Sequence, residues 1–129
     1  MSSYAGVGDR KYCIFNVRDT TTSEEIDRQF ASLYGSADDH SLVFVFNMER
    51  IRSMTLKKLM QIVPVVRKYR EESERKLIET HVIIPEKWAY KILKCFIALP
   101  VVKTARPVKL HRDKTLLRVI SEGGVALAH

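Results

Sequence analysis

Residues 42–48 read LVFVFNM, a continuous apolar run of the kind found in strands that are covered on both faces. Upstream of it, residues 11–18 (KYCIFNVR) alternate with the period of two that is typical of a strand. Downstream, residues 80–84 (THVII) form a further short apolar run. The sequence therefore predicts three strands around a buried centre, and the segments between them decide how these strands connect.

The segment between the first two strands has the pattern of a helix. Thr22 and Glu25 have the spacing of a capping box, in which side chains satisfy the free N–H groups of a helix start. Gly35 is the kind of residue that ends a helix. The apolar residues between these signals recur at helical spacing: Ile26, Phe30, Leu33 and Tyr34.

Two more helices follow. One begins near Thr55, and Pro64 predicts a kink or a break in it because proline removes a backbone hydrogen bond. The other begins at Pro85 and stops before Pro100. The residues expected on its buried face are Trp88, Ile92, Cys95, Phe96 and Leu99. We therefore expect Trp88→Ala to destabilise the fold by a few kcal/mol, as large core truncations do.

The order of these elements predicts the fold class. Residues 106–111 (RPVKLH) predict a last strand, which Pro107 places at a sheet edge, and residues 114–120 a last helix. Strands that alternate with helices form mainly parallel sheets with right-handed crossovers. We expect one small α/β domain over residues 10–120, with a four- to five-stranded, mainly parallel sheet and alternating helices. Residues 1–9 and 121–129 are expected to be flexible termini.

The composition is that of a soluble domain. The 129 residues suit a single domain, and 46% of them are hydrophobic and 29% charged. No apolar stretch approaches the roughly 20 residues that span a membrane, and the polar start does not resemble a secretory signal. Cys13 and Cys95 are expected to be buried free thiols in a reducing compartment. We therefore expect a cytoplasmic protein, with a homodimer as an open alternative.

Positive charge is concentrated in the second half of the chain. The net charge of +7 divides into −2 for residues 1–55 and +9 for residues 56–129. Such an asymmetry suits an acidic protein partner, an anionic membrane or nucleic acid, although these side chains also solvate helices. The run 103–118 lacks aromatic residues, which argues against recognition of single-stranded nucleic acid. The candidate anion- or partner-binding residues are Lys87, Lys91, Lys94, Lys103, Arg106, Lys109 and Arg112.

The sequence shows no catalytic motif. Gly6 and Gly8 precede a strand instead of following one, so they do not form a phosphate-binding loop. No histidine pair has metal-ligand spacing on a helix, and we expect neither a metal nor a cofactor. His81 and His111 fall on two predicted strands and could approach each other in space. An enzyme that uses both is the weaker alternative, and side chains on opposite faces of the sheet would exclude it.

Residues 47–55 (NMERIRSMT) lead from the central strand into a helix start. In open α/β sheets, ligands gather at the carboxyl ends of the strands. Ser53 and Thr55 are predicted at a helix N-terminus, where free backbone N–H groups receive a phosphate. They are candidate phosphorylation sites, and ordinary helix caps are the alternative interpretation.

Residues 41–112 resemble the core of the CRAL-TRIO lipid-binding family, and more closely its divergent BCH-type branch. The resemblance is carried by the strand SLVFVFN, a helix with a charged tail that contains Tyr69, the strand 81–85 that ends in proline, the following helix with Trp88 near its start, and a short strand at a basic position, residues 108–111. The same alternation is similar to the STAS domain, whose phospho-accepting serine maps loosely onto Ser53. The chain departs from both patterns. The STAS Asp-x-Ser signature is missing from residues 47–55, and we expect these 129 residues to be too few to supply the gate helices that enclose a lipid.

Together these resemblances imply a non-catalytic regulatory or binding module that acts through protein-protein contacts. A lipid or small apolar ligand is a further expectation. The alternative function is peripheral binding to an anionic surface, either an acidic membrane or nucleic acid, through the basic second half of the chain.

Overall fold

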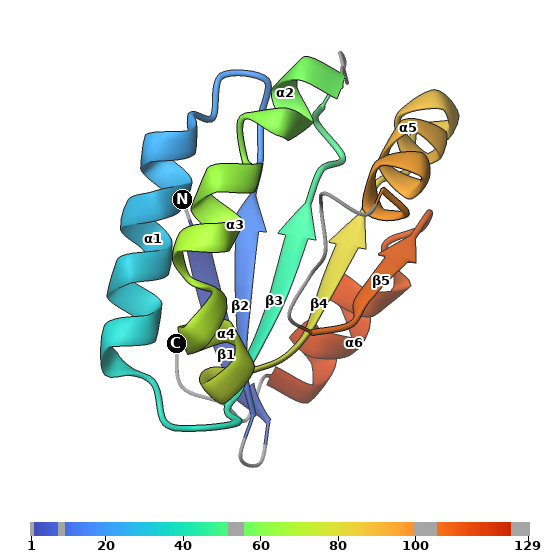
Figure 1. Cartoon of the computed structure of the whole chain (residues 1–129). Coiled ribbons are helices and arrows are strands. Elements are labelled where there is room, and N and C mark those ends of the chain that lie inside the picture. The colour runs from blue at the N-terminus through green and yellow to red at the C-terminus, as the bar shows by residue number, and fades with distance from the viewer. Residues whose placement is uncertain (1, 8–9, 52–55, 100–105, 125–129) are drawn as a thin grey trace.

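The computed structural model describes residues 2–7, 10–51, 56–99 and 106–124, and Figure 1 shows one sheet with helices on both sides. The sheet has five strands in the order β1-β2-β3-β4-β5. They are β1 (Ser2–Val7), β2 (Arg10–Asn16), β3 (Leu42–Asn47), β4 (Leu77–Ile83) and β5 (Val108–His111). β1 is antiparallel to β2, and the other three pairs are parallel. The predicted α/β class with a mainly parallel sheet is confirmed.

The helices are distributed unequally between the two faces of the sheet. They are α1 (Ser23–Ser36), α2 (Leu56–Met60), α3 (Val63–Lys68), α4 (Arg70–Lys76), α5 (Lys87–Ile97) and α6 (Thr115–Gly124). In Figure 1, α1 to α5 lie on the near face and α6 lies behind the sheet. No helix among the described residues is long and apolar enough to cross a membrane.

Local sequence signals position the first helices as predicted. Thr22 is the N-cap of α1, and its hydroxyl accepts a hydrogen bond of 3.2 Å from the Glu25 N–H. The helix predicted from Thr55 is broken into α2 and α3, and Pro64 lies in the first turn of α3. A proline is tolerated there because the N–H that it lacks has no partner within a helix start.

The sheet has a large core on one face and a smaller one on the other. On the side of α1 to α5, Phe15 and Phe44 pack with Phe30 in an aromatic cluster, and ring centroids lie 5.1 to 5.7 Å apart. On the α6 side, Val45 and Ile83 of the central strands pack against α6. β3 is therefore covered on both faces, as its continuous apolar sequence predicted.

The predicted orientation of α5 is wrong for three of the five residues expected on its buried face, whereas Phe96 is buried as predicted and Ile92 is half-buried against the core. Trp88 is 69% exposed, and Cys95 and Leu99 are also exposed. The residues that α5 buries are Ala89, Leu93 and Phe96. The helix is thus rotated by about one residue, or roughly 100°. Because the apolar residues of this segment cover more than half of the helix, two faces compete for burial, and packing against the sheet selects the one with Leu93.

Both ends of the chain also differ from expectation. Residues 2–7, expected as part of a flexible terminus, form β1 and pair with β2 from Ser2 opposite Phe15 to Val7 opposite Arg10. α6 continues four residues beyond the predicted domain end at residue 120.

The last two strands agree with the prediction except at one boundary. β4 begins at Leu77, three residues before the predicted strand. β5 lies at the edge of the sheet, as Pro107 predicted.

Candidate functional site

A largely apolar cavity of about 170 Å³ lies on the helix-covered face of the sheet, between α3 and α5. Phe44 and Val82 contribute to it from β3 and β4, Val66 from α3, and Leu93 and Phe96 from α5. We call it the α3–α5 cavity. An apolar cavity of about 150 Å³ holds a benzene molecule, so this volume can accept a group of about one six-membered ring.

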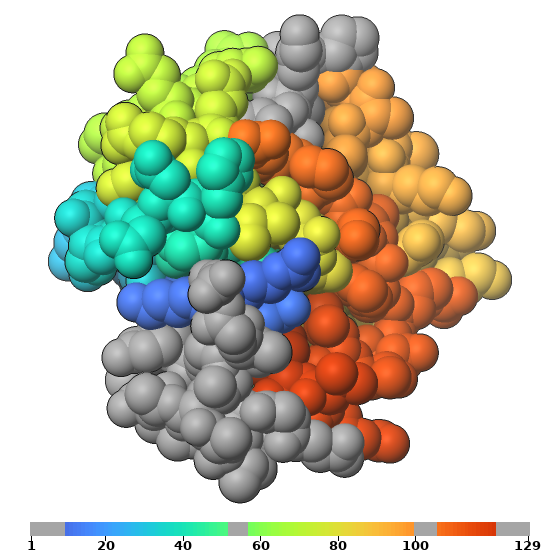
Figure 2. Space-filling view, turned by 90° about the horizontal axis from the view of Figure 1, so that it is seen from below, coloured from blue at the N-terminus to red at the C-terminus, as the bar shows by residue number. Residues whose placement is uncertain are grey.

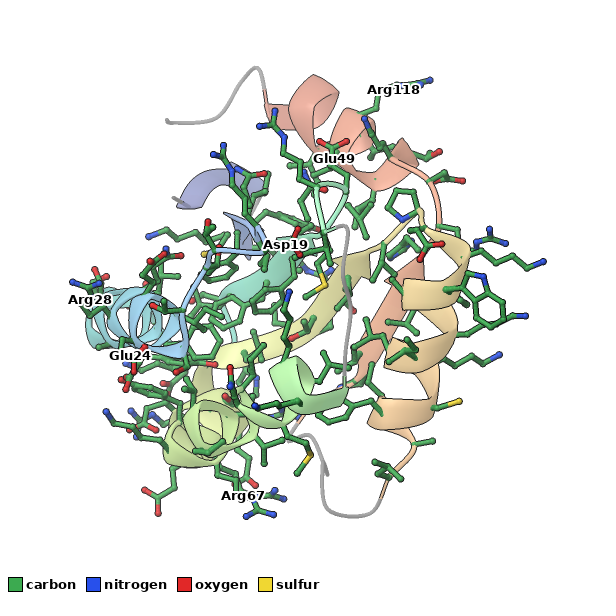
Figure 3. The ribbon with its side chains drawn as sticks, turned by 90° about the horizontal axis from the view of Figure 1, so that it is seen from above. Asp19, Glu24, Arg28, Glu49, Arg67 and Arg118 are labelled. Carbon is green, nitrogen blue, oxygen red and sulfur yellow. The ribbon has the colours of Figure 1, made fainter. Side chains whose placement is uncertain are left out.

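The charged side chains that line the α3–α5 cavity are all arginines. They are Arg67, Arg70 and Arg106, and no Asp or Glu is among its described lining residues. Arg70 forms an ion pair with Glu74 at 3.3 Å. In Figure 3, Arg67 extends outward from the helical layer, at the rim of the molecule. The cavity thus combines an apolar interior with a cationic border, an arrangement that favours an anionic group on a bound molecule.

Arg106 has a buried donor that no described residue satisfies. One terminal nitrogen, Nη2, donates to the backbone carbonyl of Glu74. Its Nε is buried and has no hydrogen-bond partner among the described residues. None of the ion pairs of the described residues includes Arg106. A buried donor without a partner is uncommon in native proteins and carries a desolvation penalty of about 1–3 kcal/mol or more.

A second candidate surface is the exposed side of α5. We call it the basic α5 face, and its residues are Lys87, Trp88, Lys91, Lys94 and Cys95, all exposed. The Lys91 Nζ lies 5.2 Å from the centroid of the Trp88 ring. The Glu86 carboxylate caps the helix by accepting from the N–H groups of Trp88 and Ala89. A large aromatic side chain among lysines is a surface composition typical of interaction sites.

The seven predicted basic residues do not form one patch. Lys87, Lys91 and Lys94 share the basic α5 face, and Arg112 lies near it, with its guanidinium carbon 5.7 Å from the Tyr90 ring. Arg106 instead lines the cavity. Lys109 pairs with Glu79 at 3.3 Å on the α6 side. Lys103, Ser53 and Thr55 lie outside the described residues, so these predictions stay untested.

His81 and His111 lie on the same face of the sheet and contact each other. His81 Nδ1 is 2.8 Å from His111 Nε2, and His81 Nε2 is 2.5 Å from the Glu79 carboxylate. An ionised carboxylate can only accept, so His81 Nε2 carries the proton of that bond. His81 Nδ1 then accepts from His111 Nε2 when both rings are neutral. The three side chains form an ordered chain, which we call the Glu79–His81–His111 chain.

The pKa values of the Glu79–His81–His111 chain depend on its position between β4, β5 and α6. Burial lowers the pKa of His111, and the nearby His81 lowers it further. Burial alone would raise the pKa of Glu79, but hydrogen bonds from His81 and Lys109 outweigh burial and hold it below its ordinary value. Among the described residues, no group of three or more His, Cys, Asp or Glu side chains is placed to hold a metal ion.

Sequence reasoning missed Glu79 and the cavity for different reasons. Glu79 precedes the predicted strand, but it lies two positions before His81, so a strand predicted from Leu77 would have placed both side chains on one face. The cavity has no sequence signal, because its lining residues have the pattern of ordinary core residues. A smaller cavity of about 120 Å³, lined by Asp19 and Lys58 among others, lies near the carboxyl ends of β2 and β3, where a ligand site was expected.

Comparisons with known proteins identify the fold. No family model matches the sequence, and the search of curated proteins finds no match. A solved structure with similar architecture is the crystal structure of an uncharacterized protein of the DUF3478 family with a SpoIIAA-like fold, from Shewanella loihica PV-4. The TM-score is 0.60 and the identity 14%, over 93% of this chain and 92% of that one.

This neighbour places the chain among small α/β domains of the SpoIIAA-like, or STAS-like, architecture. The STAS part of the predicted resemblance is therefore confirmed at the level of the fold. The CRAL-TRIO part finds no support in these comparisons.

Proposed function

We propose that the chain is a non-catalytic binding module that contacts an acidic protein partner through the basic α5 face. The supporting observation is Trp88, which is 69% exposed on a helix that has a buried apolar face of its own. Tryptophan is enriched among the residues that dominate the energy of protein interfaces. The three exposed lysines around it would steer an acidic partner and set its register.

The size of the basic α5 face favours a protein over a membrane. Each lysine near an anionic membrane contributes about 1 kcal/mol, so Lys87, Lys91 and Lys94 together would give only weak attachment. A protein partner can add a pocket for the Trp88 ring and carboxylates for the lysines. The same residues then give both affinity and specificity.

Charge reversal on α5 tests this proposal. The variant Lys91→Glu/Lys94→Glu should fold normally, because both side chains are exposed, and should lose partner proteins in co-purification from the cells that express the chain. A matched control is Arg28→Glu/Arg118→Glu, which changes the charge equally at two exposed sites that Figure 3 shows away from α5. Equal recovery of partners with both variants would contradict the proposal.

Flotation of anionic vesicles separates the membrane alternative. Vesicles of phosphatidylserine and phosphatidylcholine should not retain the protein at physiological salt. Retention that disappears at 0.5 M salt and in Lys91→Glu/Lys94→Glu would favour a membrane surface over a protein partner. A gel-shift assay with duplex DNA tests the nucleic-acid alternative in the same way, and strong salt dependence would be its signature.

A second candidate function rests on the α3–α5 cavity. An apolar cavity of about 170 Å³ supports the binding of a small apolar ligand. Native mass spectrometry of the freshly purified protein tests this directly. A discrete mass that travels with the folded chain and extracts into organic solvent would support a ligand, whereas a bare chain that also fails to bind added apolar probes would contradict it.

The Glu79–His81–His111 chain keeps the enzyme alternative geometrically open, because the two histidines are in contact instead of on opposite faces. Two observations support the non-catalytic proposal nevertheless. Both ring nitrogens of His81 form hydrogen bonds, one with His111 and one with Glu79. Neither the α3–α5 cavity nor the smaller cavity is lined by His81 or His111.

A further inference from the structure

The α3–α5 cavity has a chemical asymmetry that defines the ligand more closely than its size does. Apolar side chains from the sheet, α3 and α5 form most of its lining. Its polar lining residues include Ser73 of α4, Thr80 of β4 and Arg106, which precedes β5. A molecule that fills this cavity would therefore need an apolar body and one polar group.

Arg106 indicates that this polar group is negatively charged. Its guanidinium carries a permanent positive charge, and among the described residues it donates to a neutral carbonyl, that of Glu74. Its Nε is buried without an acceptor among the described residues, and Arg106 is one of the residues that line the cavity. An ionised ligand in the cavity would balance this charge through a charge-assisted hydrogen bond from the guanidinium.

Ser73 is less available than Arg106. The Ser73 hydroxyl is 2.6 Å from the hydroxyl of Tyr34, which is 3% exposed. Burial raises the pKa of Tyr34 to about 12, because it outweighs the hydrogen bond to Ser73, which lowers this pKa. The phenol therefore stays neutral. The Tyr34–Ser73 pair therefore supplies no charge. The positive charge at the cavity comes from three arginines, of which Arg70 is paired with Glu74 and Arg67 extends outward, so Arg106 is the one that the proposal uses.

The volume limits the apolar body of the ligand. A cavity of about 170 Å³ holds about one aromatic ring or a short branched chain, by comparison with the benzene-sized cavity of about 150 Å³. It does not enclose a membrane lipid with two long chains. We propose that the α3–α5 cavity binds a small apolar carboxylate, such as an aromatic monocarboxylic acid, with its carboxylate on Arg106. This inference rests on the cavity as a ligand site, which is the second candidate function above.

Calorimetry with three probes tests the inference. Phenylacetate carries both the ring and the charge, benzyl alcohol has a ring of the same size without a charge, and acetate has the charge alone. We expect phenylacetate to bind at least tenfold more tightly than either of the other two. Since each probe is soluble and small, the comparison isolates the contributions of the ring and of the carboxylate.

Arg106→Met assigns the preference to a residue. Methionine keeps an unbranched apolar stem but removes the charge and the Nε donor. We expect this variant to bind phenylacetate and benzyl alcohol equally, with the affinity for benzyl alcohol unchanged. The matched control is Arg118→Met, because Arg118 is exposed on α6, on the other side of the sheet, and should keep the full preference (Figure 3).

The outcomes distinguish failure of the carboxylate inference from failure of the proposal that the cavity binds a ligand. If benzyl alcohol binds wild type as tightly as phenylacetate, the carboxylate inference is wrong although the cavity is a ligand site. If neither ring compound binds, the cavity is not a ligand site and both proposals fail. If acetate binds as tightly as phenylacetate, or if Arg106→Met keeps the preference, the carboxylate is held elsewhere. If Arg106→Met does not fold, Arg106→Lys supplies the test, because it keeps the charge and should retain only part of the preference.

Discussion

The orientation of α5 in the structure predicts that Leu93→Ala destabilises the fold more than Trp88→Ala, whereas the sequence alone predicted a large cost for Trp88→Ala. Trp88→Ala removes a side chain of which only about a third is buried, whereas Leu93→Ala removes one that is 95% buried. A tryptophan side chain buries roughly 200 Å² at most, so a third of it at about 25 cal/mol per Å² amounts to under about 2 kcal/mol. The better helix propensity of alanine offsets about 0.5 kcal/mol of this. We therefore expect Trp88→Ala to destabilise the fold by about 1 kcal/mol.

For Leu93→Ala we expect a loss of about 2–5 kcal/mol, because a fully buried leucine leaves a void beside Phe96 and the sheet. Urea unfolding followed by far-ultraviolet circular dichroism measures both variants. Tryptophan fluorescence is unsuitable for this comparison, because Trp88 is the single tryptophan of the chain.

The fluorescence of wild type provides an independent check of the same orientation. Iodide should quench the native emission strongly, because Trp88 is exposed and Lys91 attracts the anion. A loss of 3 kcal/mol or more in Trp88→Ala, together with less than 1 kcal/mol in Leu93→Ala, would refute the orientation of α5. A native emission that iodide does not quench would refute it as well.

Three further predictions concern buried groups. The pKa of His111 is lowered in the folded state, so the unfolded chain binds more protons as the pH falls through the ordinary histidine value near 6.5, and the free energy of unfolding should fall between pH 7 and pH 5. Urea unfolding of His111→Gln should show a smaller fall, and a fall identical to that of wild type would exclude His111 as its source. Ser73→Ala should cost about 1–3 kcal/mol, because it leaves the buried Tyr34 hydroxyl without its partner, and an unchanged unfolding midpoint would show that another acceptor replaces it. A thiol reagent should label Cys95 within the native protein and spare Cys13, which is fully buried with a pKa raised to about 11, and equal labelling rates would contradict this burial.

The sheet could be predicted from sequence because each of its signals is local. The continuous apolar run of β3 indicated burial on both faces, and the Thr22–Glu25 spacing indicated the start of α1. Pro64 gave the position at which α2 ends and α3 begins. In these cases one segment carries enough information, whatever the rest of the chain does.

The features that were missed depend on how segments meet. α5 has apolar residues around much of its circumference, so its buried face is chosen by the shape of the sheet and not by its own period. The α3–α5 cavity depends on the separation of two helices, which no residue pattern encodes. The sequence predicted Arg106 as an anion-binding residue only as one of seven basic residues, and its placement at an apolar cavity depends on how the start of β5 packs beside the helices. Residue type alone did not separate it from the exposed lysines of α5.

The most direct test of the basic α5 face as a docking surface is site-specific photo-crosslinking. A photoreactive phenylalanine analogue at position 88, which is exposed and central to this face, should form a covalent adduct of defined mass with one acidic protein. The same analogue at position 28, exposed on α1, should give no such adduct, and Lys91→Glu/Lys94→Glu should abolish the adduct at position 88. An identical set of adducts at positions 28 and 88, or an adduct that survives charge reversal, would contradict a docking surface on α5.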